Sequence, residues 1–514
     1  MGSGKNKKRI GSKKKSKKTQ RKISSDEPPT SIESVLSKAD SAMDLADMET
    51  AGRLYEYACV SLRKRMEGEE QDRKEHSESD NKNQDGDDIV VHQKSMVMIQ
   101  LAKVLGKLGE IKVAIHDQEG GRADFAEAIS LLQSEHYLYH SQNEDGHDVT
   151  SISNLSSVSS LMTRAQLIEA RAGLYLYLGQ LCESQEALES FNRGVEDFKT
   201  CCCLLTKAIE KKNEQSEMST EKDQTLHDVL FEIRKQLCGA YCTIAELFMT
   251  DLCFETDAES RCEFNIQEAI KLDTMIMNDA SRHKNMEPQH PDALQTLSSL
   301  RLSQNKGLEA VKYILDAYNR MKIGCEALAD LAGFGKDENS DYQTGISNVE
   351  NLPGNGMPKE LDESLLRAAQ TLPGFEFRCQ SVKILLECAD ILQHTIESKE
   401  YDTDSKIDIY IKDRSSCVEA AIQVLGSLMA ENDEVVEIWF LLGCAFKAST
   451  PPNLQASKYY WESSLNMLQK VKEGVEIDCT MEDELIDLNS KINEVEERLK
   501  SLELVKAEEV MDES

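Results

Sequence analysis

An all-helical fold is predicted by three features of this 514-residue sequence. Only 9 prolines and 5% aromatic residues accompany an abundance of Ala, Leu, Glu and Lys, a composition that favours helices over sheets. One stretch in the middle of the chain has the residue spacing of two packed helices. The same spacing recurs along much of the sequence, which indicates a stack of repeated units.

The clearest helix pair begins after Pro291. Leu294 and Leu297 lie three positions apart on one face of the first expected helix. Ala310 and Ile314 follow at the spacing of a second helix, and Ala317 completes that pattern. Small residues at a helix crossing let two backbones approach closely, and the bulky residues opposite fill the remaining space. This spacing resembles that of the tetratricopeptide repeat, a binding scaffold.

Other segments match the same pattern. The second strong match consists of Trp439, Leu442, Gly443 and Phe446, followed by Ala456, Tyr460 and Ser463. Weaker matches are Ala51, Tyr55 and Ala58; Gly121, Phe125 and Ala128; Tyr175, Leu178 and Gly179; and Cys262, Ile266 and Ala269. The sequence therefore predicts a right-handed superhelical solenoid of about six to seven helix pairs. An irregular helical domain with alanines at its contacts is the alternative.

A last helix with one apolar stripe is expected beyond these pairs. Its apolar residues follow a spacing of three and four: Leu485, Leu488, Ile492, Val495, Leu499 and Leu502. A single stripe of this length is typical of a helix that caps the open end of a solenoid, because an exposed final interface would aggregate. A dimeric coiled coil is the alternative use of the stripe.

The predicted organisation has five parts. Residues 1–30 form a basic tail that has too few apolar residues to fold. Residues 31–332 form the first tetratricopeptide array, and residues 333–371 form a linker that contains Gly, Asn and Pro. Residues 372–475 form a second array, and residues 476–514 the capping helix with an acidic tail.

Charge is divided between two opposed blocks. Residues 1–25 contain eleven Lys or Arg and no acidic residue, so the rest of the chain, with all 92 Asp and Glu, has a net charge of −43. Such a body repels nucleic acid phosphates and attracts polycations. We therefore expect no direct nucleic acid partner, except through the tail. Solubility alone is the alternative reason for the acids.

The lysine clusters of the tail resemble a nuclear import signal. An RNA-contacting tail or a merely solubilising one are the alternatives. An import receptor is an expected partner of this segment, and cytoplasm and nucleus are the expected locations. The residues concerned are Lys5, Lys7, Lys8, Arg9, Lys13, Lys14, Lys15, Lys17 and Lys18.

Cysteine usage indicates a reducing compartment. The 15 cysteines include the run Cys201-Cys202-Cys203 but no C-x-x-C pair. The start of the chain lacks an apolar signal segment, and no run of 18 apolar residues is present to span a bilayer. The sequence therefore predicts a soluble intracellular protein, monomeric and without a membrane partner.

Catalytic and metal-binding patterns do not emerge from the sequence. His136 and His140 lie four residues apart, but no third ligand follows at a recognised spacing. Gly333 to Lys336 lacks the remainder of a phosphate-binding loop, and the acids after it lack the glycine and glutamate of a calcium loop. We predict a protein that is not an enzyme and that has no cofactor and no metal.

Three segments together resemble a particular family. They are Pro291–Leu297, Leu372–Arg378 and Asp433–Gly443, and in combination they are similar to the fungal and plant assembly chaperones dedicated to the fourth protein of the large ribosomal subunit. The resemblance implies a superhelical holdase. Such a protein captures the newly made basic ribosomal protein through its extended loop and escorts it to the nucleus for ribosome assembly.

The first helices of stacked pairs are expected to line the groove that holds such a basic peptide. Counting from the repeat spacing, the predicted groove residues are Glu33, Asp40, Asp44, Tyr177, Glu183, Asp292, Glu437 and Phe440. A groove for the acidic tail of a general chaperone needs Lys and Asn at the positions of Leu36 and Asp40, so the sequence argues against that kind of groove. An acidic histone chaperone and a passive scaffold of a multiprotein complex are the remaining alternatives.

Overall fold

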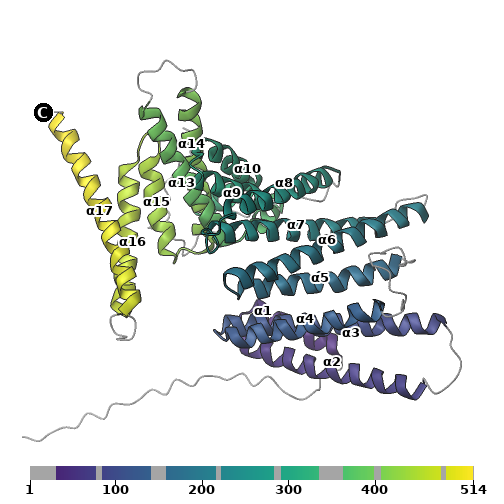
Figure 1. Cartoon of the computed structure of the whole chain (residues 1–514). Helices are drawn as coiled ribbons and strands as arrows, with labels where there is room; N and C mark the ends of the chain where they lie inside the picture. The colour runs from purple at the N-terminus through teal and green to yellow at the C-terminus, as the bar shows by residue number, and fades with distance from the viewer. Residues whose placement is uncertain are drawn as a thin grey trace, which may run out of the picture. The chain divides into compact units, whose positions relative to one another are not determined.

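Helices are the regular secondary structure throughout the part of the chain that the structure describes, and that part contains no strand. The structure is a computed structural model (Figure 1). It describes residues 31–76, 84–140, 158–215, 221–282, 291–334, 363–398, 407–475 and 482–512. The predicted all-α class is confirmed.

Seven helix pairs, each with a short first-to-second-helix connection, account for most of the described residues. The first helices are α1 (Ile32–Asp44), α3 (Gln84–Ala114), α5 (Val158–Gln180), α7 (Glu221–Met249), α9 (Asp292–Ser303), α13 (Phe375–Ser398) and α15 (Val436–Ala448). Their partners are α2 (Met48–His76), α4 (Gln118–His140), α6 (Ser184–Gln215), α8 (Ala258–Arg282), α10 (Gly307–Leu331), α14 (Ile407–Glu431) and α16 (Leu454–Val475). Two further helices, α12 (Glu363–Gln370) and α17 (Glu482–Asp512), lie outside these pairs.

The chain divides into two compact units, Met1–Gln142 and Asn143–Ser514, called unit 1 and unit 2 below. The linker predicted at residues 333–371 lies within unit 2. Part of it is the helix α12, which packs on α10 so closely that a Cβ added to Gly324 would lie 2.5 Å from the carbonyl oxygen of Ala368. Because α10 also packs against α13 and α14, the two arrays predicted around this linker are in contact.

The turns between paired helices follow from a few residues that favour them. Ala46 (φ 55°) and His116 (φ 66°) adopt the left-handed backbone conformation that reverses the chain. The next residue in each turn is an aspartate that caps the second helix. Asp47 Oδ1 accepts a hydrogen bond from the Thr50 amide at 3.1 Å, and Asp117 caps α4 in the same way. Capping satisfies backbone N–H groups that have no partner inside the helix.

The α9–α10 pair confirms the packing predicted from the spacing of small and bulky residues. Leu294 and Leu297 are buried, and Ala310, Ile314 and Ala317 are completely so. At this crossing Ser298 takes the small position, and its hydroxyl donates to the carbonyl of Ala310 at 2.9 Å. Truncating a buried Ile to Ala in such a core destabilises by about 2–5 kcal/mol.

The α15–α16 pair follows the predicted pattern with one correction. Gly443 faces the indole ring of Trp461, which is fully buried. The third small residue of the second helix was predicted at Ser463, but this residue is only half-buried, and Ser464 is fully buried. Ser457 and Trp461, one position after Ala456 and Tyr460, are fully buried as well, and the Ser457 hydroxyl donates to the Gly443 carbonyl at 2.7 Å.

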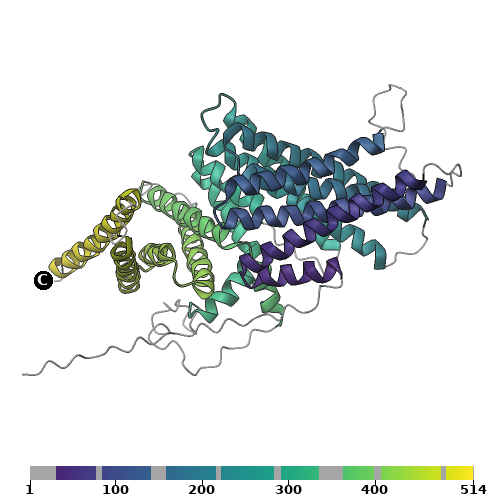
Figure 2. The same ribbon diagram turned by 90° about the horizontal axis from the view of Figure 1, so that it is seen from below.

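The helix α17 caps the end of the array, as its apolar stripe predicts. It packs along α16 (Figures 1 and 2). Leu488, Ile492, Val495 and Leu502 are buried in a cluster with Trp461. The apolar stripe of α17 is therefore buried against α16 of the same chain.

A buried arginine joins α13 to α14. Arg378 is 2% exposed, and its guanidinium donates to Glu431, to the Ser427 hydroxyl at 2.9 Å and to the Pro373 carbonyl at 3.0 Å. Hydrogen-bond acceptors around the whole group are what makes a buried charge tolerable.

Candidate functional site

A carboxylate follows the small crossing residue on four of the first helices. Successive helical residues are 100° apart around the helix axis. The side chain that follows a buried crossing residue therefore lies at the side of the contact between the two helices. In the structure Asp40, Glu246 and Asp390 are exposed and Glu110 is half-buried. We call the exposed side of the first helices the first-helix face. The four pairs are Ala39–Asp40, Gly109–Glu110, Ala245–Glu246 and Ala389–Asp390.

In unit 1 two of these acids, Asp40 and Glu110, lie near one tyrosine together with Asp44. The hydroxyl of the buried Tyr55 donates to Asp40 Oδ1 at 2.5 Å. Burial raises the pKa of Tyr55, and the negative charges of Asp40, Glu110 and Asp44 raise it further. Lys107 forms an ion pair with Glu110 at 2.8 Å. The predicted residues Asp40 and Asp44 therefore lie together, and the structure adds Glu110 to them.

Glu33 stands apart from that group, in the first turn of α1. Its own backbone N–H and the Ser31 hydroxyl hold its pKa below the usual value, because both stabilise the ionised form. A negative charge at this end of a helix is also favoured by the helix dipole. Its position is thus explained by helix capping alone.

In unit 2 two acids from adjacent first helices face each other. Thr296 of α9 donates to Glu246 of α7 at 3.3 Å, and Asp292 lies one helical turn before Thr296. Glu246 reaches solvent, but the protein around its carboxylate desolvates it and raises its pKa, and the nearby charge of Asp292 raises it further. The predicted residue Asp292 is therefore part of a pair whose second member, Glu246, the sequence analysis missed.

The face continues from α9 to α13 and α15. Gln295 of α9 donates to the Phe377 carbonyl at 3.0 Å and to Ser381 at 3.1 Å, which ties α9 to α13. Lys383 of α13 forms an ion pair with the predicted residue Glu437 of α15 at 2.7 Å. The exposed side of α13 is mostly acidic or polar, and consists of Glu376, Gln380, Lys383, Glu387, Asp390, His394 and Glu397.

The remaining three predicted residues lie in different settings. Tyr177 is 42% exposed on α5, four residues after Gly173, where an added Cβ would meet nothing within 4 Å. Glu183 lies in the α5–α6 turn rather than on the first-helix face, and its carbonyl accepts backbone hydrogen bonds that begin α6. Phe440 is half-buried, because α17 covers it and the Arg498 guanidinium sits 5.5 Å from its ring centre.

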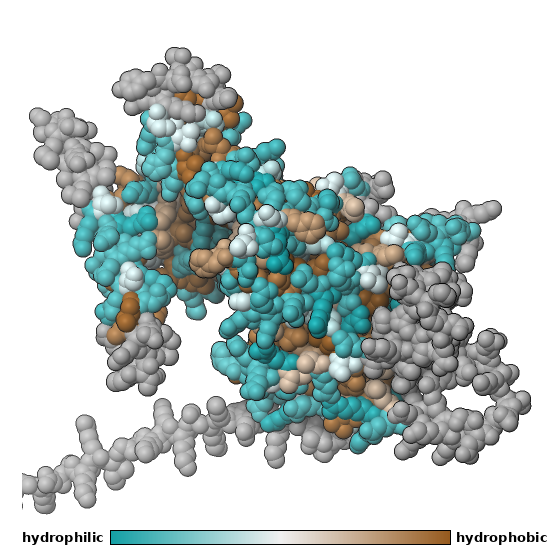
Figure 3. All heavy atoms as spheres, viewed as in Figure 1, coloured by the Kyte–Doolittle hydropathy of each residue, from teal (hydrophilic) through white to brown (hydrophobic). Residues whose placement is uncertain are grey.

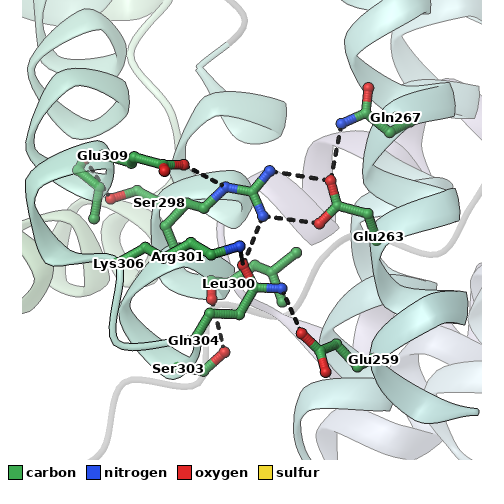
Figure 4. Close-up of polar contacts among 11 residues, drawn as sticks. Glu259, Glu263, Gln267, Ser298, Leu300, Arg301, Ser303, Gln304, Lys306 and Glu309 are labelled. Atoms are coloured by element: carbon green, nitrogen blue, oxygen red, sulfur yellow. Dashed lines mark hydrogen bonds and ion pairs between the residues drawn. The ribbon is translucent and has the colours of Figure 1, made fainter.

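An ionic network holds α8, α9 and α10 together at one end of this face (Figure 4). Arg301 donates to both carboxylate oxygens of Glu263, at 2.8 and 3.0 Å, and pairs with Glu309 at 3.3 Å. Gln304 accepts from the same guanidinium and donates to Glu259 at 2.8 Å. The Arg301 hydrogen bond holds the pKa of Glu263 below its usual value.

Other kinds of site are not visible in the described residues. No group of three or more His, Cys, Asp or Glu side chains is placed there to hold a metal ion. None of the described helices is long and apolar enough to cross a membrane. Hydrophilic residues dominate the face of the molecule shown in Figure 3. The eight lysines and one arginine of the predicted import signal lie outside the described residues, and so do the side chains of His136 and His140.

The chain is similar to a protein of Schizosaccharomyces pombe (strain 972 / ATCC 24843) described as "Probable assembly chaperone of rpl4". The two are 24% identical over 379 residues, which is 71% of this chain and 73% of that protein. No protein-family model matches the chain.

Solved structures of helical repeat proteins give low TM-scores with this chain. A circular tandem repeat protein covers 93% of this chain and 97% of its own at 14% identity, with a TM-score of 0.29. Yeast Tom70 covers 91% of this chain and 96% of its own at 10% identity, with a TM-score of 0.19. Neither likeness carries an argument about fold or function.

Proposed function

We propose that this protein is an assembly chaperone that binds a newly made, basic protein of the large ribosomal subunit. The observation that carries the proposal is the similarity to the S. pombe protein over 71% of the chain. The acidic first-helix face is the physical support. It offers carboxylates at a repeated position on four of the first helices to a cationic polypeptide.

The binding mechanism is a sum of weak contacts. An extended basic segment of the client lies along the first-helix face, and each exposed ion pair contributes about 0.2–1 kcal/mol. Several such pairs, together with burial of apolar client residues, give a stable complex without any single strong contact. Because exposed charges are screened by salt, affinity falls as ionic strength rises.

Glu246 and Asp292 are the preferred positions for a client lysine or arginine. Two like charges raise each other's free energy, and the pKa of Glu246 shows that its ionised form is disfavoured in the unbound protein. A client cation relieves this repulsion. Asp40, Asp44 and Glu110 offer a second acidic group within unit 1, where burial, the hydrogen bond to Asp40 and these negative charges raise the pKa of Tyr55.

The basic tail completes the proposal. Its lysine clusters act as an import signal that an import receptor reads, so the chaperone, as a monomer, takes its client from the cytoplasm to the nucleus. Binding itself requires no catalysis and no cofactor.

The test is binding of a fluorescent peptide that contains the basic extended loop of the ribosomal protein, followed by anisotropy at 0.05 to 0.5 M salt. We expect saturable binding that weakens as salt rises. The double variant Glu246→Lys/Asp390→Lys weakens binding about tenfold or more, because two attractive contacts become repulsive. Glu189→Lys, on the exposed side of the second helix α6, is the control that changes charge away from the first-helix face.

Two results would contradict the proposal. Equal weakening by Glu189→Lys would show that only net charge matters and that the first-helix face has no special role. Equal affinity for unrelated basic peptides such as histone tails would favour an acidic histone chaperone over a dedicated ribosomal one.

A further inference from the structure

The turn between α7 and α8 holds one aromatic ring almost entirely in solvent. Phe254 is 97% exposed. The turn itself is well anchored, because Leu252 and Ala258 on either side of the phenylalanine are buried. The Leu252 amide donates to the Leu247 carbonyl at 2.9 Å, and the Ala258 amide donates to the Glu255 carbonyl at 3.1 Å. The ring is thus held outside the core by a defined backbone.

The residues before and after Phe254 in the sequence include several acids. Asp251, Glu255 and Asp257 are exposed, and no lysine or arginine occurs between Leu247 and Ser260. The next basic residue, Arg261, lies over the ring of Phe248 at 4.4 Å from its centre. The turn therefore presents a large apolar group within an acidic segment.

The turn lies at the end of the first-helix face. Glu246, in the last turn of α7, is only eight residues before Phe254. Hydrogen bonds tie this region to both neighbouring turns: Gln185, at the start of α6, donates to Glu255 at 3.3 Å, and Gln304 of the α9–α10 turn donates to Glu259 at 2.8 Å (Figure 4). A peptide that follows the face past Glu246 reaches the ring next.

Two turns of unit 1 also expose an apolar residue. Leu45, the first residue after α1, is 81% exposed, and Ile115, the first residue after α3, is 58% exposed. Phe254 instead lies five residues after the end of α7, so its position in the turn is different. A single exposed apolar residue is common on protein surfaces and needs no explanation. What distinguishes Phe254 is its nearly complete exposure together with the acids on both sides of it.

We propose that Phe254 is an apolar anchor for the client, and that it contacts an apolar residue flanked by lysine or arginine in the client's basic segment. This inference rests on the proposed function. Aromatic residues that become buried in a partner's pocket carry a large share of the binding energy at interfaces. A basic side chain also gains from contact with the face of the ring. The acids around the turn select the basic neighbours of that client residue.

The experiment measures the affinity of the full-length chain for the same fluorescent loop peptide. Phe254→Ala is expected to weaken binding about tenfold. The matched control is Phe264→Ala, which removes a ring that is 60% exposed on the second helix α8. The control is expected to bind as the unchanged chain does. Thermal unfolding monitored by circular dichroism should give the same midpoint for Phe254→Ala and the unchanged chain, because the ring packs against little.

A second variant reports the contact directly. Phe254→Trp places an indole at the exposed position, and its emission should shift to shorter wavelength when the loop peptide binds. The two native tryptophans, Trp439 and Trp461, are buried and supply a constant background. The unchanged chain with the peptide is the control for that background.

The outcomes separate this inference from the proposed function. If the unchanged chain binds the peptide and Phe254→Ala binds equally well, or the emission of Phe254→Trp does not shift, the anchor is wrong and the chaperone function stands. If the unchanged chain does not bind the peptide at all, the proposed function fails, and the anchor fails with it.

Discussion

The first-helix face of unit 2 holds carboxylates in two contrasting settings. Between α7 and α9, Glu246 lies close to Asp292 and accepts a hydrogen bond from the Thr296 hydroxyl. Between α13 and α15, Glu437 is paired with Lys383 at 2.7 Å. A client cation relieves the repulsion between Glu246 and Asp292. Beside Glu437 it must compete with Lys383. Acidity alone therefore does not identify the stronger contact.

The same two regions differ in how they are held together. α13 contains the buried Arg378, whose guanidinium is surrounded by acceptors from α14 and the preceding turn. α9 contains Arg301, whose side chain is 12% exposed and whose partners Glu263 and Glu309 reach solvent. We expect the α13–α14 region to resist opening more strongly, because a buried charge network loses more when one member is removed.

The largest effect is expected for Arg378→Ala. Removing the guanidinium leaves Glu431 and the Ser427 hydroxyl without their partner, so unit 2 should lose about 3–5 kcal/mol of its free energy of unfolding. Urea unfolding followed by tryptophan fluorescence measures this, because both tryptophans lie in α15 and α16. Arg367→Ala removes an exposed arginine of α12 and should change little; equal losses for the two variants would contradict the assigned role.

A smaller loss is expected for Arg301→Ala. Its hydrogen bonds join charged groups but are partly solvated, so the variant should lose about 1–3 kcal/mol. Arg301→Lys keeps the charge without the planar fork and should recover only part of the loss. Thermal unfolding by circular dichroism compares the three proteins. Full recovery by lysine would mean that the two-oxygen contact with Glu263 contributes nothing.

Glu246→Gln tests whether desolvation and the charge of Asp292 destabilise the ionised Glu246, and its effect has the opposite sign. The folded-state pKa of Glu246 is raised, so ionisation opposes folding at pH values above that pKa, and this penalty disappears below the unfolded value near 4.5. The variant should therefore unfold about 1–2 °C higher than the unchanged chain at pH 7. The difference should vanish near pH 4. A lower unfolding temperature of the variant at pH 7 would show that neither desolvation nor the charge of Asp292 destabilises the ionised Glu246.

The smallest effect is expected at the α13–α15 pair. Lys383 and Glu437 are both about half-exposed, and such pairs contribute about 0.2–1 kcal/mol. A double-mutant cycle with Lys383→Met, Glu437→Gln and the combined variant measures the interaction directly from urea unfolding. An interaction energy above that range, or one of the opposite sign, would remove the contrast with Glu246 and Asp292.

The spacing of small and bulky residues predicted the helix pairs because that information is local. The residues of the α9–α10 pair, from Leu294 to Ala317, lie within one helix pair, and their contacts do not depend on the neighbouring pairs. The apolar stripe of α17 is predictable for the same reason. A periodic sequence is sufficient to indicate which side of a helix must be buried.

The candidate site was harder to predict because its geometry depends on contacts between one helix pair and the next. Asp40 directly follows a small crossing residue, and so do Glu110, Glu246 and Asp390. This shared position in the sequence is a signal from which the three further acids could have been predicted. The pairing of Glu246 with Asp292 joins residues 46 positions apart and has no local sign. Sequence spacing placed Phe440 on the exposed face, but burial by α17 depends on where a later helix packs.

From its residues alone the chain specifies helices, their pairing and an acidic body with a basic tail, because helix propensity, crossing residues and charge act over short distances. The stacking of those pairs then sets which acids meet other acids, which meet a lysine, and which aromatic ring stays in solvent. Burial and electrostatic neighbours arise from packing between segments that are distant in sequence, and this is why those properties required coordinates.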